Sequence, residues 1–300
     1  MNDGVVVFNW KNFLKVILVE MFASELSKLS PKLNTQYSYF LFNRKFMNLK
    51  NPQTFAEKIS WLKINKYAQD ALVRKCADKL AVREYVQAKG FGHMLNELIA
   101  VFDDVNDIDW YKLPDAFVLK WNFGSGFNFL CHNKNEIDIK SAEKKLKQWG
   151  KKKFWLFFSE LQYKVAHKCI LCERFLDTPD SALIDYKFYC FHGKVRAVLV
   201  IERVNENAER AVFMTPSWNF MSDINYKYKD FFIPDKPKSL FEMKQAAEKL
   251  SGNFPFVRVD FYEWQGKPIF GEMTFTPAAG MNPSETLIDG KQMGEYISLD

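Results

Sequence analysis

Several features that would place this sequence in a familiar class are missing from it. Its 300 residues contain no uninterrupted apolar run of the roughly 20 residues that a membrane-spanning helix needs. The closest approach, 5–23, is broken by Lys11, Lys15 and Glu20. Zinc-finger spacing and an aromatic RNA-binding signature are also absent, which argues against nucleic acid as a partner. The glycine loops match neither GxxxxGK[ST] nor a helix-opening GxGxxG, which excludes a Walker A loop and argues against a Rossmann cofactor site.

Cysteine is scarce as well. The sequence has five cysteines, an odd number, with no secretory signal peptide ahead of them. We therefore expect reduced thiols in a cytoplasmic protein. Cys169 and Cys172 form a CxxC pattern, but the surrounding KCILCERFL is typical of a strand, where residues three apart point to opposite faces. No second CxxC accompanies it, so we predict no zinc or redox site here.

The composition is typical of a globular protein with a substantial core. Apolar residues make up 48% of the chain and charged residues 26%, which is ordinary. The length allows one large domain or two small ones. The net charge of +6 suits an anionic partner such as a nucleotide, a phosphate, an anionic sugar or an inner-leaflet lipid, without selecting among them. We interpret the run Lys151-Lys152-Lys153 as a solvated helix end.

The apolar segment 5–23 leaves two alternatives open. It can be an amphipathic helix packed against the body, which is the more common outcome, or a helix lying at a membrane surface. The location expected from the sequence is therefore cytoplasmic, with peripheral contact at the inner face of the membrane as the second alternative.

The order of patterns predicts an α+β fold, with helices first and then strands around one or two helices. Residues 1–50 form a helical extension with a break at Ser30-Pro31. Thr54 and Glu57 make a capping-box pattern, and Gly90 is placed to end a helix over 71–90. The other expected elements are strands at 98–102 and 167–176, a strand–glycine loop–strand unit from 116, helices over 138–150 and 239–250, two strands around His192-Gly193, an irregular region over 205–240, and a hairpin over 257–275.

That last hairpin, VRVDFYEWQGKPIFGEMTF, carries one carboxylate in each apolar strand, Asp260 and Glu272. An isolated buried carboxylate is costly unless it is paired, protonated or bound to a cation. Antiparallel pairing can place the two on neighbouring strands, where they would form a Mg²⁺ site with substrate phosphates and waters. The alternative is that each pairs with a nearby cation such as Arg258.

Two further segments carry charge next to apolar strands. In FVLKWNFGSGFN, Lys120 ends a strand and a glycine loop follows, so the backbone can close on an anion while the lysine supplies a charge. The alternative is a hairpin turn with a surface lysine. In DYKFYCF, Lys187 lies between apolar neighbours, and its partner is either a phosphate or Asp185. The strand LCERFL, which carries Glu173, can present backbone groups to an adenine edge.

Taken together and in this order, these segments resemble the ATP-grasp superfamily. The sequence is more specifically similar to the TupA-like branch, which is named for teichuronopeptide synthesis and found in capsule and surface-polysaccharide gene clusters. The segments that carry this similarity are NPQTFAEKISWLK, ADKLAVREYV, FVLKWNFGSG, CERFL, DYKFYCFHGK, FPFVRVDFY and GEMTF. The resemblance covers about residues 50 to 300. It implies two α+β subdomains clasping ATP within 51–300, with 116–171 as the flap or lid and 172–300 as the metal- and nucleotide-binding core.

The resemblance also implies roles for individual residues. Arg258, Lys120 and Lys187 would be catalytic, with the lysines on the phosphates and the arginine beside the transferred phosphoryl group. Asp260 and Glu272 would hold Mg²⁺. The residues implied in ATP binding are Lys79, Lys120, Ser125, Gly126, Cys172, Glu173, Phe175, Asp185 and Lys187, with backbone around Cys172 to Phe175 on the adenine.

One position departs from the family pattern. Many ATP-grasp enzymes have Asn two residues after the metal-binding Glu, where this sequence has Thr274. The following loop, TFTPAAGMNP over 274–283, also differs from the Gly-Ser-rich version that the resemblance leads us to expect. These differences leave a second metal site and the details of acceptor binding open.

The activity implied is an ATP- and Mg²⁺-dependent carboxylate–amine ligase that forms an amide through an acyl phosphate. Its partners would be a small-molecule or glycan carboxylate, such as a uronic acid of a bacterial surface polysaccharide, and an amine. Two alternatives stay open: a phosphotransferase or glycosyltransferase on the same fold, and a non-enzymatic membrane-associated scaffold. The complete set Lys120, Lys187, Asp260 and Glu272 argues against the scaffold, because a decayed site is expected to lose some of these residues.

Overall fold

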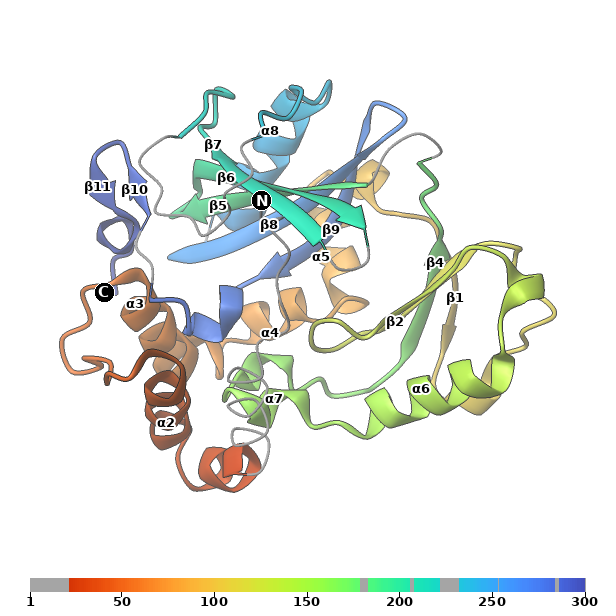
Figure 1. Ribbon diagram of the computed structural model, residues 1–300, viewed down its shortest axis with the longest axis horizontal. Helices are drawn as coiled ribbons and strands as arrows, with labels where there is room; N and C mark the ends of the chain where they lie inside the picture. Colours follow the sequence, from red (N-terminus) through yellow and green to blue (C-terminus); the bar gives the residue numbers. More distant parts are fainter. Residues whose placement is uncertain are drawn as a thin grey trace, which may run out of the picture.

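The computed structural model describes residues 22–178, 183–205, 208–221, 232–252, 254–283 and 286–299. Within them, two antiparallel sheets lie beside each other, one of four strands and one of five, with helices around both (Figure 1). This is the α+β architecture predicted from the sequence. The segment 5–23 lies outside the described residues except for its last two, so its packing stays a prediction.

The N-terminal part is helical, as expected. Residues 22–29 are helical, and α2 (Pro31–Asn43) begins after Ser30, whose hydroxyl accepts a hydrogen bond of 3.3 Å from the Leu33 amide. The predicted capping box opens α3 (Phe55–Leu62): Thr54 accepts from the amide of Glu57, and Glu57 accepts from the amide of Thr54. A π-helical turn, η1 (Lys63–Tyr67), continues α3.

The single helix predicted over 71–90 is wrong. The structure has two helices there, α4 (Ala71–Ala77) and α5 (Ala81–Ala88). The break falls at Asp78, whose carboxylate accepts from the amides of Leu80 and Ala81 at 2.8 and 3.2 Å. A side chain that caps free amides in this way competes with the continuous helix. Gly90, with φ of +91°, ends the second helix as predicted.

The smaller sheet has the strand order β1-β4-β2-β3. Its strands are β1 (Leu98–Phe102), β2 (Phe117–Trp121), β3 (Asn128–Cys131) and β4 (Ile170–Arg174). Helix α6 (Ile139–Lys151) lies along it (Figure 1), and its buried residues join a core with strand residues such as Leu119 and Cys172. The sheet thus takes in β1 and part of β4 beyond 116–171, and the division into lid and core stays a prediction.

The larger sheet has the order β7-β6-β5-β8-β9. Its strands are β5 (Ile184–Phe191), β6 (Lys194–Asn205), β7 (Ala208–Met214), β8 (Phe256–Trp264) and β9 (Lys267–Thr274). The predicted turn at Gln265-Gly266 joins the last two, with φ of +52° and +73°. Strand β7 corrects the irregular region expected over 205–240: residues 208–214 form a strand that pairs antiparallel with the preceding strand β6, from Asn205↔Ala208 to Val198↔Met214.

Helix α8 (Leu240–Ser251) packs against β5, β6 and β8, and residues of α3, α4 and α5 belong to the same large core. The remaining short elements are α7 (Phe154–Phe157), a small hairpin of β10 (Leu287–Ile288) and β11 (Lys291–Gln292), and 3₁₀ turns η2 (Gly92–Met94), η3 (Val105–Asp107), η4 (Lys134–Glu136), η5 (Leu161–Tyr163), η6 (Pro277–Gly280) and η7 (Met293–Tyr296).

Candidate functional site

A cavity of about 240 Å³ lies between the two sheets, lined by residues from both. Strands β2, β3 and β4 contribute from the smaller sheet and strands β5, β6, β8 and β9 from the larger one, and the break before α5 contributes Lys79. Ten of the residues implied by the sequence line this one cavity: Lys79, Lys120, Ser125, Gly126, Glu173, Asp185, Lys187, Arg258, Asp260 and Glu272. Residues spread over almost 200 positions of sequence therefore meet at one place.

The two carboxylates of the hairpin lie directly opposite each other, Asp260 in β8 and Glu272 in β9. A bulge makes this pairing. From Trp264↔Lys267 to Phe261↔Phe270 the register is regular, and then Asp260 pairs with Glu272, leaving Gly271 as an extra residue. Without the bulge Glu272 would face Val259, on the other side of the sheet from Asp260, because side chains alternate between faces.

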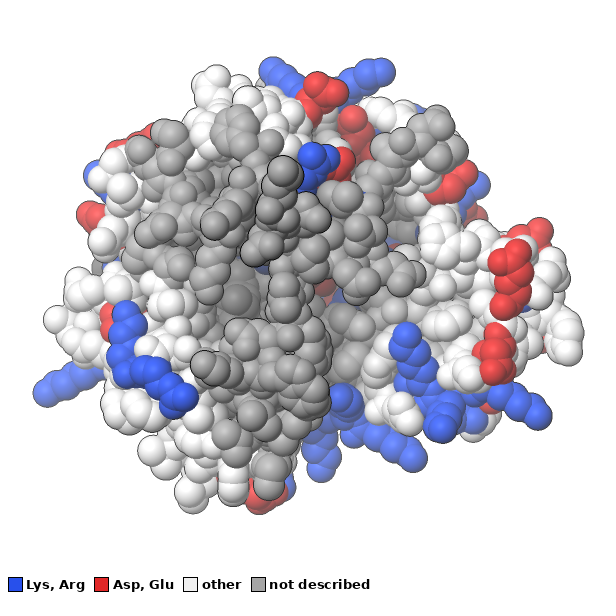
Figure 2. Space-filling view, viewed as in Figure 1, with Lys and Arg blue, Asp and Glu red and all other residues white. Residues whose placement is uncertain are grey.

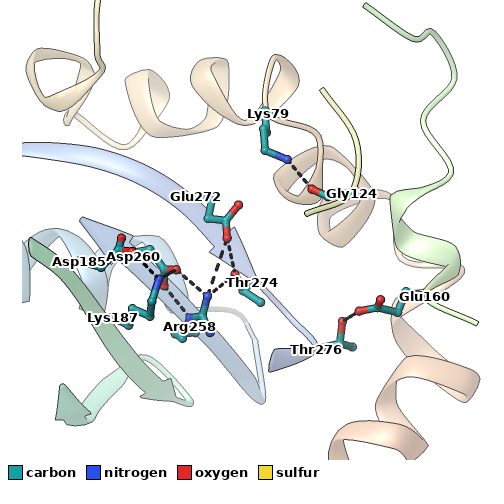
Figure 3. Close-up of polar contacts among 10 residues, drawn as sticks. All are labelled: Lys79, Gly124, Glu160, Asp185, Lys187, Arg258, Asp260, Glu272, Thr274 and Thr276. Atoms are coloured by element: carbon teal, nitrogen blue, oxygen red, sulfur yellow. Dashed lines mark hydrogen bonds and ion pairs between the residues drawn. The ribbon is translucent and has the colours of Figure 1, made fainter. Parts of the chain in front are cut away.

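Lys187 completes a row across three strands. In register, Lys187 of β5 pairs with Asp260, which pairs with Glu272. Lys187 Nζ lies 3.0 Å from Asp260 Oδ2 and 3.3 Å from Asp185 Oδ2. Figure 3 shows this row with Arg258 beside it. Burial alone would lower the pKa of Lys187, but the charge of Asp260 opposes burial and the pKa is raised, so this lysine stays protonated.

Asp260 is the most enclosed charge of the site, with 2% of its side chain exposed. Arg258 donates to both of its oxygens, from Nε at 2.7 Å and from Nη2 at 2.6 Å. Burial by itself would raise the pKa of Asp260, but Arg258 and Lys187 outweigh burial and lower it. The pairing with Arg258, which the sequence left open as an alternative, is therefore present, and the carboxylate is ionised.

Thr274, at the position where the resemblance leads us to expect Asn, belongs to the same group. Its hydroxyl accepts from Arg258 Nη2 at 3.1 Å and donates to Glu272 Oε1 at 3.2 Å. Thr274 therefore orients the Glu272 carboxylate instead of offering a metal ligand of the amide type.

The glycine loop is attached to the break before α5. Lys79 Nζ donates to the carbonyl oxygen of Gly124 at 2.5 Å (Figure 3). The Lys79 amide donates to the Asn122 carbonyl at 2.9 Å. Burial lowers the pKa of Lys79, opposed by the charge of Glu272. Ser125 and Gly126 follow at the cavity wall. The loop residues and Lys79, which is bonded to the loop, thus line the same cavity.

Glu173 is paired at the far side of the cavity. It accepts from Lys120 Nζ at 2.7 Å and from Arg83 Nη1 at 3.2 Å. Both basic side chains are partly buried. The lysine that ends β2 is therefore a cavity residue, and the alternative of a surface lysine does not hold.

Two of the implied residues do not line the cavity. The side chain of Cys172 is buried in the core of the smaller sheet, and the ring of Phe175 lies 4.6 Å from that of His132. Their backbone role toward an adenine stays a prediction. The structure adds cavity residues that the sequence reasoning missed: Arg83, Asn128, Arg203, Tyr262, Phe270 and Gly271.

A signal for two of these was available. Arg83 follows Lys79 by four residues within ADKLAVREYV, and Tyr262 follows Asp260 by two residues in the same strand and hence on the same face.

The donor set fits a magnesium ion bound together with a polyphosphate. Mg²⁺ takes one or two carboxylates and completes its shell with phosphate oxygens and water. Glu272, with 36% of its side chain exposed, faces the cavity, while Asp260 is held by Arg258 and Lys187. Among the residues that the structure describes, no group of three or more His, Cys, Asp and Glu residues could hold a metal ion by itself.

Away from the cavity, lysines gather over α6 (Figure 2). Lys140, Lys144, Lys147 and Lys151 follow one another along this helix, and 151–153 are exposed as expected for a solvated helix end. No helix in the described part of the chain is long and apolar enough to cross a membrane.

Two sheets with flanking helices enclose a cavity lined by lysines, arginines and opposed carboxylates, which is the arrangement of an ATP-grasp protein. The sequence matches the family model described as TupA-like ATP-grasp over residues 57–298. The chain belongs to the TupA-like ATP-grasp family, which confirms the family and the fold predicted above. No curated protein matches the sequence.

Solved structures with a similar fold include D-alanine–D-alanine ligase from Bacillus anthracis complexed with ATP, with 16% identity, a TM-score of 0.40, and coverage of 67% of this chain and 55% of that one. The ATP-grasp ligase PsnB, complexed with a minimal precursor, Mg and ADP, has 11% identity, a TM-score of 0.39, and coverage of 73% and 57%. The ADP complex of PurK, N5-carboxyaminoimidazole ribonucleotide synthetase, has 14% identity, a TM-score of 0.42, and coverage of 73% and 50%. The chain thus spans 50% to 57% of the length of these proteins. The assignment to the family rests on the family match alone.

Proposed function

We propose that this protein is an ATP- and Mg²⁺-dependent carboxylate–amine ligase. The observation that carries the proposal is the row Lys187–Asp260–Glu272, which places two opposed carboxylates and a lysine on one cavity wall. Two neighbouring carboxylates repel each other. Arg258 and Lys187 already pair with Asp260, and a cation shared with a triphosphate would offset the remaining negative charge of Glu272.

In this proposal each residue has a defined task. Lys79, Lys120 and Lys187 neutralise the phosphates, and Arg258 lies beside the phosphoryl group that is transferred. Asp260 and Glu272 hold Mg²⁺, whose chemistry is to draw charge from the phosphate oxygens. The loop with Ser125 and Gly126 covers the phosphates and excludes water, which would otherwise hydrolyse an acyl phosphate.

The reaction has two steps. A carboxylate oxygen of the first substrate attacks the γ-phosphorus of ATP, the bond to the β–γ bridging oxygen breaks, and ADP leaves. The amine nitrogen of the second substrate then attacks the acyl carbon, the carbon–oxygen bond to phosphate breaks, and the nitrogen loses a proton as the amide forms. The residues of the protein bind and orient the two substrates and neutralise the charge of the phosphates.

We further propose the substrate class and organisation of the chain. The carboxylate belongs to a uronic acid or another unit of a bacterial capsule or surface polysaccharide, which is supported by the family resemblance of the motifs. Residues 1–50 are a helical extension and 51–300 form the ATP-grasp domain, with 116–171 as the lid and 172–300 as the core. The protein works in the cytoplasm, with membrane contact through 5–23 as the alternative.

Calorimetry of ATP binding tests the proposal, with and without Mg²⁺, on the wild type and on Glu272→Gln. Mg²⁺-dependent binding that is lost in the variant supports it and justifies screening uronates with amines for ADP release. If the wild type binds no ATP, the ligase proposal fails and a scaffold is favoured. If ADP forms with a hydroxyl acceptor and no amine is needed, the protein is a phosphotransferase.

A further inference from the structure

The loop that follows β9 is held in an uncommon conformation. Ala278 and Ala279 have φ of +49° and +55°, and Gly280 has +74°. The left-handed region is unfavourable for residues with a Cβ atom, and three consecutive residues there persist only where the surroundings hold them. The loop begins two residues after Thr274, the last residue of the strand that carries Glu272.

One element that holds this loop is a lysine with no exposed surface. Lys63, the first residue of η1, donates from Nζ to the carbonyl oxygens of Ala279 at 3.0 Å and Phe158 at 2.8 Å. Burial lowers the pKa of Lys63 to about 8, and the charge of Glu160 opposes this effect. Burying an ammonium group costs free energy, whereas an apolar side chain would hold the two backbone segments together by packing alone.

The second element is Glu160, with 4% of its surface exposed. Thr276 Oγ1 donates to Glu160 Oε1 at 2.5 Å, and Gln162 Nε2 donates to the same Thr276 oxygen at 2.8 Å. Ser159, the residue before Glu160, also has a left-handed backbone conformation, with φ of +55°. In Figure 3 the Glu160–Thr276 contact lies beyond the end of β9, away from Asp260 and Glu272.

This buried pair is connected to the cavity through the backbone. Thr276 is fixed by Glu160, and Thr274, two residues earlier, holds Glu272 by its hydroxyl and contacts Arg258. A shift of Thr276 therefore moves the end of β9, on which Thr274 and Glu272 depend for their position.

We propose that Lys63 and Glu160 are positioning residues of the ligase. They fix the loop Thr276–Gly280, and through it the orientation of Glu272 toward Asp260 and the metal–nucleotide complex. The inference rests on the proposed function, because it assigns the pair an effect on the metal-dependent part of ATP binding.

The test uses the full chain and two substitutions at Thr276. Thr276→Val keeps the shape and removes the hydroxyl, whereas Thr276→Ser keeps the hydroxyl. Calorimetry gives the ratio of the ATP dissociation constants without and with Mg²⁺. We expect this ratio to fall about tenfold in Thr276→Val, the size of effect seen when a group that orients a metal ligand is lost, and to stay at the wild-type value in Thr276→Ser.

The double variant Lys63→Met with Glu160→Gln covers the case in which a single change prevents folding, because it removes both buried charges together. We expect the same loss of the Mg²⁺ effect, while ATP still binds without Mg²⁺. Tyr85→Phe is the matched control: it removes a buried hydrogen bond of 2.8 Å to the Leu250 carbonyl, in contact with α8 instead of the loop. Its thermal stability should fall while the ratio stays unchanged.

Three outcomes overturn the proposal. If Thr276→Val is less stable but keeps the wild-type ratio, or if Thr276→Ser loses as much as Thr276→Val, the contact is structural only and the ligase proposal is unaffected. If the wild type itself shows no effect of Mg²⁺ on ATP binding, the proposed function fails first and this inference fails with it.

Discussion

Glu272 faces Asp260 across the β8–β9 ladder because Gly271 adds one residue to β9 at that point. The two carboxylates nevertheless differ in their surroundings: 2% of the Asp260 side chain is exposed, and 36% of the Glu272 side chain. Asp260 is bonded to Arg258 and Lys187, while the nearest ion pair of Glu272 is 3.8 Å long. The same chemical change should therefore have different effects at the two positions.

Glu272→Gln should abolish turnover with little loss of stability. The ion pair of Glu272 with Arg258 is long, at 3.8 Å, and its carboxylate is partly exposed, so it contributes less than about 1 kcal/mol to folding. The carboxylate itself is needed for the metal ion in the proposed reaction. ADP release with a carboxylate and an amine, together with urea denaturation, measures both effects. Full activity in this variant would show that the metal assignment is wrong.

Asp260→Asn should instead destabilise the fold, by roughly 3–5 kcal/mol, because it leaves Arg258 and Lys187 buried without their shared anion. Urea denaturation of the two variants side by side makes the comparison. The prediction fails if Asp260→Asn is as stable as Glu272→Gln. The matched substitution at Glu272 controls for the change from carboxylate to amide.

The stability difference between the wild type and Asp260→Asn should depend on pH. Burial by itself would raise the pKa of Asp260, but the charges of Arg258 and Lys187 outweigh burial. The pKa is therefore lowered below its ordinary value of 3.8. A carboxyl group with a lower pKa in the folded state stabilises the protein above its unfolded pKa, and this contribution disappears as pH falls through the folded pKa. We therefore expect the difference to be constant above about pH 5 and to shrink below about pH 4.

Denaturation curves of both proteins at several pH values measure this effect. Comparing the two proteins at each pH removes the contribution of the other titrating groups. A difference that stays constant down to about pH 3 would contradict the assigned shift of the Asp260 pKa.

Gly280→Ala should destabilise the protein more than Gly290→Ala. Both glycines have φ of +74°, so the cost of placing alanine in the left-handed region, about 1 kcal/mol, is common to the two. A Cβ atom at Gly280 would lie 2.6 Å from Ser60 Oγ, whereas nothing lies within 4 Å of one at Gly290. Thermal denaturation gives the two losses, and equal values would show that the loop after β9 has room to adjust.

Much of the fold could be predicted from the sequence because its signals are local. Thr54 and Glu57 indicate the start of α3, Gln265-Gly266 indicates the turn of the last hairpin, and Gly90 indicates the end of a helix. The charged residues of the apolar strands, together with their resemblance to the ATP-grasp superfamily, implied ten residues that line one cavity. Where a local signal was ambiguous, as at Asp78, the continuous helix was the wrong prediction, because a capping side chain reads like an ordinary helix residue.

By itself, therefore, the sequence determined the residue types of the site and the strands that carry them. Only the tertiary structure decided that Asp260 and Glu272 share a face, because a bulge at Gly271 changes the register without changing the hydrophobic pattern. The pairing of Glu173 with Lys120 and Arg83, and the burial of Lys63 near Glu160, were likewise decided in three dimensions. Whether a charge is exposed, paired or bound depends on segments about 50 to 100 residues apart, and no short-range pattern records those distances.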